Sequence, residues 1–104
     1  MSFAKTHLFP PELQMISFYA RALCHPARII IIKELHHQQE MNVSELTRKL
    51  PLSRSSVSQH LEILRNYDFV SYIEDYPIIF YRLKKQNVRK AITAIHSFDH
   101  DFSF

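Results

Sequence analysis

Residues 42–83 read NVSELTRKLPLSRSSVSQHLEILRNYDFVSYIEDYPIIFYRL, a stretch that predicts two short helices, a tight turn between them and a following β-hairpin. The first helix begins at Asn42, whose side chain can accept from the Glu45 N–H while the Glu45 carboxylate reaches back, as in a capping box. Pro51 stops this helix, because it lacks an N–H and disfavours the α region for the preceding residue. Ser53 then caps the second helix, which runs to about residue 66.

The second helix has one apolar side and one polar side. Val57, Leu61 and Leu64 recur at i, i+4 and i+7, so they are predicted to face the core. Serine, glutamine and arginine on the other side carry the donors and acceptors that base edges and phosphates require. Only the first turns of such a helix usually reach the floor of the major groove, so Glu62 and Asn66 are expected to lie too far along. We predict base contacts from Arg54 and Gln59, and positioning contacts to phosphate or base edges from Ser55, Ser56, Ser58 and His60.

Two β-branched and aromatic runs, residues 69–74 and 78–83, predict the hairpin. A hairpin directly after the second helix distinguishes a winged helix-turn-helix from the plain form. The chain contains no glycine, so the intervening residues 75–77 are expected to turn through a wider loop. The tip is acidic at Glu74 and Asp75, which predicts either that the wing contributes less to DNA affinity or that Tyr76 and Arg82 make what contact there is.

At this point the chain resembles the ArsR-like, or arsenic-repressor-type, winged-helix transcriptional regulators. The resemblance covers roughly residues 11–98, and its most specific part is Leu52-Ser53-Arg54-Ser55-Ser56-Val57-Ser58-Gln59-His60-Leu61, followed by Leu64-Arg65. Further matching residues are Ala22-Leu23, Pro26, Arg28, Val43-Ser44-Glu45-Leu46 and Tyr81-Arg82-Leu83. The resemblance implies a homodimer that binds double-stranded operator DNA and usually represses until a signal releases it.

The flanking segments are predicted to be helical. Pro11 opens a first helix with apolar residues on two faces, Leu13, Ile16, Ala20 and Leu23 on one and Met15, Tyr19 and Ala22 on the other. A second helix runs from Pro26 to about Gln38, and its Ile29–Ile32 run is expected to be the buried centre. A last helix spans about Gln86 to Ser97 with a stripe of Val88, Ala91, Ile92, Ile95 and Phe98, and the resemblance implies that the first and last helices form the dimer interface. The alternative is that these stripes complete the monomer core.

Bulk properties bound the function. A chain of 104 residues is expected to form one domain, residues 1–104, with little room for an enclosed active site. The net charge of +3 suits a polyanionic partner only weakly. No Gly-rich phosphate loop, nucleophile elbow or pair of catalytic carboxylates is visible, so we predict that the protein is not an enzyme. A single cysteine and no apolar run of membrane-spanning length predict a cytoplasmic protein with no membrane partner.

The inducing signal is not readable from these residues. Metal-sensing members of the resembling family carry a Cys-x-Cys in the helix matching residues 43–50, and this chain has no thiol there. His96 and His100, flanked by Asp99 and Asp101, have an i, i+4 spacing that could chelate zinc or nickel, but seven histidines make chance pairs common. No metal or other cofactor is therefore predicted. Cys24 is expected to be a buried, inert residue at the end of the first helix, because no second cysteine could resolve an oxidised thiol.

A second function remains open. Winged helices also serve as protein-interaction or dimerisation modules, in which the polar face of residues 53–66 would be an ordinary solvated surface. Three serines after the cap, in one short helix, favour the DNA-binding interpretation, because serine is a mediocre helix former while its short hydroxyl can approach a phosphate closely.

Overall fold

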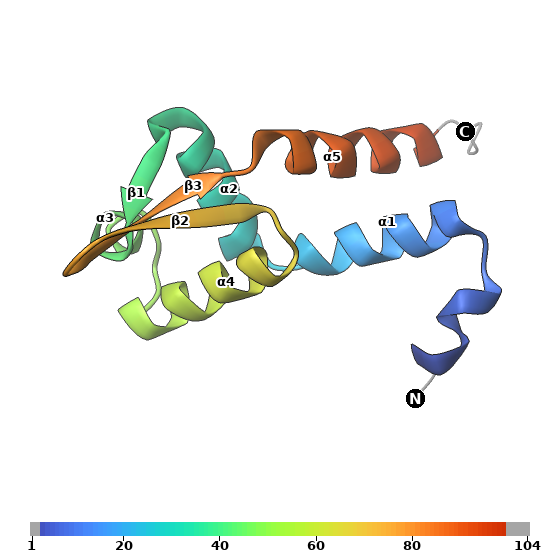
Figure 1. Cartoon of the computed structure of the whole chain (residues 1–104), viewed down its shortest axis with the longest axis horizontal. Coiled ribbons are helices and arrows are strands. Elements are labelled where there is room, and N and C mark those ends of the chain that lie inside the picture. The colour runs from blue at the N-terminus through green and yellow to red at the C-terminus, as the bar shows by residue number, and fades with distance from the viewer. Residues whose placement is uncertain (1–2, 100–104) are drawn as a thin grey trace.

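The computed structural model describes residues 3–99, which form a small helical body, a three-stranded sheet and two projecting helices (Figure 1). A 3-10 helix, η1 (Phe3–Leu8), precedes α1 (Pro11–Ala22) and α2 (Pro26–Gln38). The central elements are β1 (Glu40–Asn42), α3 (Val43–Thr47) and α4 (Arg54–Asn66). The chain continues as β2 (Val70–Asp75), β3 (Ile78–Leu83) and α5 (Lys85–Asp99).

The caps predicted for the two central helices are present. The Asn42 side chain accepts from the Glu45 N–H at 2.8 Å, and the Glu45 carboxylate accepts from the Asn42 N–H at 3.0 Å. The Ser53 hydroxyl accepts from the Ser56 N–H at 3.2 Å and so opens α4. Helix α3 is shorter than predicted, because it ends at Thr47 and passes into a hydrogen-bonded turn before Leu50. The predicted order of helix, tight turn and helix is confirmed.

The core lies where the helical body meets the inner face of the sheet. Val57, Leu61 and Leu64 of α4 are fully buried, as their spacing predicts. The expectation that the whole Ile29–Ile32 run is buried is wrong. Ile31 is completely buried but Ile29 is 46% exposed, because successive residues of a helix point in different directions around its axis. The remaining core residues include Ala22, Ala27, Leu35, Met41, Leu46, Leu50, Phe69, Val70, Val88 and Ala91.

The sheet has the strand order β1-β3-β2, with both pairs antiparallel. The hairpin of β2 and β3 is the predicted wing, whereas the short strand β1 was not predicted. In β1 Met41 lies opposite Tyr81, and its side chain is buried, so this strand closes one side of the core. The pairing also joins the segment before α3 to β3, the central strand of the sheet.

The wing turns more tightly than expected. Asp75 lies directly opposite Ile78, so the reversal contains only Tyr76 and Pro77, and the prediction of a wider loop is wrong. The peptide bond between these two residues is cis. Tyr76 is 91% exposed at the tip, beside the acidic residues Glu74 and Asp75.

Within residues 3–99, two residues have a positive φ, although the chain contains no glycine. Gln39 has φ 68° after α2, and Asp68 has φ 62° after α4. The Asp68 carboxylate forms an ion pair with Lys84 at 2.5 Å and accepts from the Asn87 amide at 3.0 Å. The hydrogen bond from Lys84 holds the pKa of Asp68 below its ordinary value. These contacts tie the end of α4 to the start of α5.

Helices α1 and α5 lie side by side and antiparallel, and both extend away from the winged body (Figure 1). The described residues measure 46 × 31 × 24 Å with a radius of gyration of 15.4 Å. A compact chain of this length would have a radius of gyration of about 13 Å, so the two projecting helices make the molecule elongated. Within residues 3–99 no single helix is long and apolar enough to cross a membrane; α1 and α2 would suffice only together, and they are bent by 88°.

Candidate nucleic-acid interface

The candidate interface is the outward side of α4. Three buried apolar residues fix the opposite side of this helix to the core, and α4 also packs against α2 and α3. Ser55, Ser58 and Gln59 are exposed, as predicted, while Ser56 is half-buried. Because the first two turns of α4 carry these groups, the exposed N-terminal half of the helix presents hydroxyl and amide groups to solvent.

Three serine hydroxyls lie close together at the N-terminus of α4. The Ser53 hydroxyl lies 3.1 Å from the hydroxyls of both Ser55 and Ser56. Arg54 reaches across to α3 and donates to the Ser44 hydroxyl. A guanidinium group carries five N–H donors, so this contact leaves Arg54 with further donors for a phosphate or a base. The contact with Ser44 therefore holds the Arg54 side chain beside α3, at the start of α4.

His60 is half-buried on α4 and contacts residues at the start of α2. Its ring lies 4.3 Å from the ring of His25, between ring centres, and its Nδ1 lies 3.4 Å from Nη1 of Arg28. Burial, followed by the nearby His25 and Arg28, lowers the pKa of His60. This position corresponds to the polar edge of the core, and a contact of His60 with DNA stays a prediction.

Arg28 is the charged residue at the centre of this contact, and the sequence did not reveal its role. It is only 6% exposed. Its Nε donates to the Ala22 carbonyl oxygen at 2.8 Å, and its Nη2 donates to the Arg21 carbonyl oxygen at 3.2 Å. These carbonyls lie at the C-terminal end of α1, where a helix leaves its last acceptors without intrahelical partners. Arg28 therefore connects the C-terminal end of α1 and the N-terminal end of α2 to α4.

Cys24 lies in the short connection between α1 and α2. The expectation that it is buried is wrong, because the residue is exposed. Its Sγ accepts from Nη2 of Arg28 at 3.1 Å. The helix ends before this residue, so the thiol sits at the surface of the joint and not in the apolar interior.

The C-terminal half of α4 has other contacts. Glu62 pairs with Arg65 at 2.9 Å, and the Arg65 guanidinium lies 4.9 Å from the centre of the Tyr72 ring on the wing. The hydrogen bond with Glu62 raises the pKa of Arg65. These side chains connect α4 to the wing, and the expectation that Glu62 does not read bases stays a prediction.

The wing offers little positive charge. Its one arginine, Arg82, forms an ion pair with Glu40 of β1 at 2.8 Å, so part of its charge is already neutralised. Glu74 and Asp75 stay exposed near the tip. Tyr76 is therefore the better placed of the two residues predicted to contact DNA from the wing.

The possible metal ligands at the end of the chain are described only in part. His96 and Asp99 belong to α5, whereas His100 and Asp101 lie outside the described residues. Within residues 3–99, no group of three or more histidine, cysteine or acidic side chains is arranged to hold a metal ion.

Several known proteins with a similar sequence or structure are named as transcriptional regulators. The family model described as "Bacterial regulatory protein, arsR family" matches residues 25–72. The nodulation protein NolR of Rhizobium meliloti is 32% identical over 102 residues, which cover 91% of this chain and 83% of the relative. The biofilm growth-associated repressor of Agrobacterium fabrum is 32% identical over 79% of this chain and 69% of its own length. The crystal structure of NolR from Sinorhizobium fredii superposes with a TM-score of 0.70 and 31% identity, over 86% of this chain and 93% of that one.

Proposed function

This chain belongs to the arsR family of bacterial regulatory proteins, and we propose from that premise that it acts as a homodimeric repressor reading a pseudo-palindromic operator with α4. The family and the relatives show that it is a DNA-binding transcriptional regulator and not an enzyme. Repression is the direction we favour, because more of the similar proteins are named repressors than activators.

The observation that carries the proposed DNA contact is the division of α4 into two sides. Val57, Leu61 and Leu64 are fully buried, whereas Ser58 and Gln59 between them are exposed. A helix held this firmly to the core can present its polar side to the major groove without rearrangement. We propose base contacts from Arg54 and Gln59 and positioning contacts from Ser55, Ser56, Ser58 and His60.

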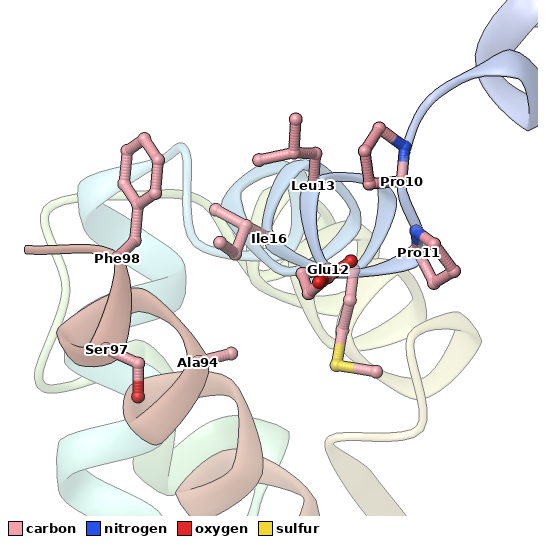
Figure 2. A pocket seen from close by; sticks show the side chains of 9 residues that line it. Pro10, Pro11, Glu12, Leu13, Ile16, Ala94, Ser97 and Phe98 are labelled. Atoms are coloured by element: carbon pink, nitrogen blue, oxygen red, sulfur yellow. The ribbon is translucent and has the colours of Figure 1, made fainter. Parts of the chain in front are cut away.

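The projecting helices support the proposed homodimer. Leu13 and Met15 of α1 and Ile95 of α5 are 43%, 48% and 37% exposed, respectively. At the N-terminal end of α1 and the C-terminal end of α5, apolar residues from both helices line an opening of about 820 Å³ (Figure 2). Ile16 and Leu13 project from α1 on one side of it, and Phe98 projects from α5 on the other (Figure 2). An apolar surface of this kind on an elongated protomer is suited to a second copy of the chain.

A twofold dimer would present two copies of α4 to DNA. In regulators of this kind the two reading helices enter successive major grooves about 34 Å apart, and the operator mirrors the symmetry of the protein. We therefore propose a half-site for each protomer, read by one domain that spans residues 1–104. We also expect the protein to act in the cytoplasm, where the DNA that it would regulate is found.

The test is a fluorescence-anisotropy titration of the purified protein with the promoter of its own gene and with a scrambled duplex of the same composition. A preference of about 10³ or more for the promoter is expected for a sequence-specific regulator. A panel of other promoter fragments from the source genome extends the search for the operator. Equal affinity for all of these duplexes would contradict the proposal and make a protein-interaction module the better interpretation.

A further inference from the structure

A second groove, of about 430 Å³, lies between the C-terminal half of α2 and the N-terminal half of α5, with the end of β3 at its base. Its volume falls within the range of small-molecule sites, which is roughly 300–1,000 Å³. It is separate from the opening in Figure 2, and no residue of α4 lines it. The proposed DNA-reading and dimer surfaces therefore leave this groove unexplained.

The floor of the groove is apolar. It consists of Ile32 from α2, Leu83 from the end of β3, and Val88 and Ile92 from α5. Val88 belongs to the buried core, so the floor rests on well-packed side chains, whereas Ile92 rises from it with 58% of its surface exposed. A hydrocarbon chain or an aromatic ring would be removed from water on such a floor.

The rim of the groove is positively charged. Lys33 lies on α2, and Lys85 and Arg89 lie one helical turn apart on α5. His36 and His37 continue the rim on α2. Among the ten lining residues none is acidic. Across residues 3–99, Lys33, Lys85 and Arg89 form neither an ion pair nor a side-chain hydrogen bond with another residue.

We propose that this groove is an effector site for an amphipathic organic anion, with an apolar body on the floor and a carboxylate at the rim. Three cations around one opening repel one another, and a bound anion would relieve that repulsion. Lysine and arginine also supply charge-assisted hydrogen bonds to a carboxylate. A neutral apolar ligand would leave these donors unused, and a cation would be repelled.

The position of the groove explains how such a ligand would act on DNA binding, and this part rests on the proposed function. Helix α2 packs against α4, and α5 packs against α1. A ligand between α2 and α5 would therefore contact both the body that carries α4 and a helix of the proposed dimer interface. If the ligand and the operator prefer different angles between these parts, each lowers the affinity of the protein for the other by the same factor.

The experiment uses the full chain and three probes with the same eight-carbon tail, namely octanoate, octan-1-ol and octylamine. Isothermal titration calorimetry without DNA measures the affinity of each probe. The test variant is Lys33→Gln/Arg89→Gln. The matched control is Lys5→Gln/Lys90→Gln, which removes the same charge from two exposed positions outside the groove. Circular dichroism verifies that both variants are folded.

Octanoate is expected to bind the unaltered protein and the control alike, and to bind the test variant at least ~10-fold more weakly, a difference of about 1.4 kcal/mol. The alcohol and the amine are expected to bind at least that much more weakly to all three proteins. Equal affinity for the three probes, or no loss in the test variant, would overturn the site. These outcomes do not depend on whether the protein binds DNA.

The regulatory part is tested by the promoter titration described above, with and without saturating octanoate. A shift in the affinity for the promoter of about threefold or more, absent in the test variant, is expected. If octanoate binds selectively while the affinity for the promoter stays unchanged, the groove is not an effector site. The proposed function would stand in that case, because promoter binding is measured in the same titration.

Discussion

The Arg28 guanidinium on α2 lies 3.4 Å from Nδ1 of His60 on α4, so a buried cation contacts the helix that we propose reads DNA. An arginine can only donate, so His60 accepts at Nδ1 and, when neutral, carries its proton on Nε2. The same guanidinium donates to carbonyl oxygens at the end of α1. One side chain therefore holds α4 in place relative to the two helices that precede the winged body.

Replacement of Arg28 by methionine is expected to destabilise the protein. Arg28→Met keeps a long apolar stem but removes the side-chain donor to the Ala22 carbonyl oxygen, and leaves the Arg21 carbonyl oxygen with the Cys24 N–H. The expected loss is about 2–3 kcal/mol in the free energy of unfolding, measured by urea denaturation. The exposed Arg48 provides the control, since Arg48→Met should change stability by less than about 0.5 kcal/mol. Equal effects of the two substitutions would contradict the role given to Arg28.

Stability is expected to fall in mild acid because of His60. Its pKa is lowered in the folded protein, mainly by burial and then by His25 and Arg28, so the unfolded chain takes up the proton at a higher pH. The contribution of this group is therefore fully present above the ordinary histidine value of about 6.5, and is lost as the pH falls through that value toward the lowered one. The urea midpoint of the unaltered protein should drop more between about pH 7.5 and pH 5.5 than that of His60→Gln. Parallel pH profiles for the two proteins would show that His60 is not responsible.

Loss of the cap of α4 is expected to cost about 1 kcal/mol. Ser53→Ala removes the oxygen that accepts from the Ser56 N–H, and the first turn of the helix loses that partner. Ser58→Ala is the matched control, because it removes the same hydroxyl from an exposed position inside the helix, where alanine is the better helix former. Thermal or urea unfolding of both variants distinguishes the cap from a general effect of removing serine. A control as unstable as Ser53→Ala would argue against the cap.

Gln59→Ala is expected to weaken binding to the operator by about 1–3 kcal/mol and to relax sequence preference. The reason is that the Gln59 amide can both donate to and accept from a base edge, whereas an alanine side chain has no polar group. Asn66→Ala serves as control, since it removes an exposed amide from the far end of the same helix. Anisotropy titrations with operator and random duplexes measure both effects. An equal loss of affinity for the two duplexes would show that Gln59 does not read sequence.

Leu13→Glu is expected to convert the proposed dimer to a monomer, because it places a carboxylate on the apolar side of α1 that we propose is covered by the second copy. Size-exclusion chromatography with light scattering measures the mass. Ile78→Glu is the control, since Ile78 is 44% exposed, like Leu13 at 43%, but lies on the wing. A control that dissociates equally, or a Leu13→Glu protein that stays dimeric, would place the interface elsewhere.

The features that could be predicted from the sequence are local ones. The capping residues Asn42 and Ser53 accept hydrogen bonds from residues three positions later in the chain. These contacts could therefore be predicted without knowledge of the rest of the fold. The buried stripe of α4 follows equally from helical periodicity. From these signals both central helices could be predicted. The same signals predicted that Ser55, Ser58 and Gln59 are exposed, as the structure shows.

Features that depend on distant contacts were missed. Strand β1 has three residues and no alternating pattern of its own, and it forms by pairing with β3 about 40 positions later. Likewise, His60 meets Arg28 across 32 positions, so nothing near either residue revealed the contact. Cys24 was misplaced for a related reason, because its exposure depends on where α1 ends and how α2 turns away from it.

The acidic wing tip has a consequence for how the complex would respond to ionic strength. Each DNA phosphate that a protein neutralises releases condensed counterions, so the affinity falls with added salt in proportion to the number of such contacts. Glu74 and Asp75 neutralise none, and Arg82 is already paired with Glu40. Binding would then rest more on the direct contacts of α4 than on counterion release. The complex would hold its operator over a wider range of potassium concentrations than one with a basic wing.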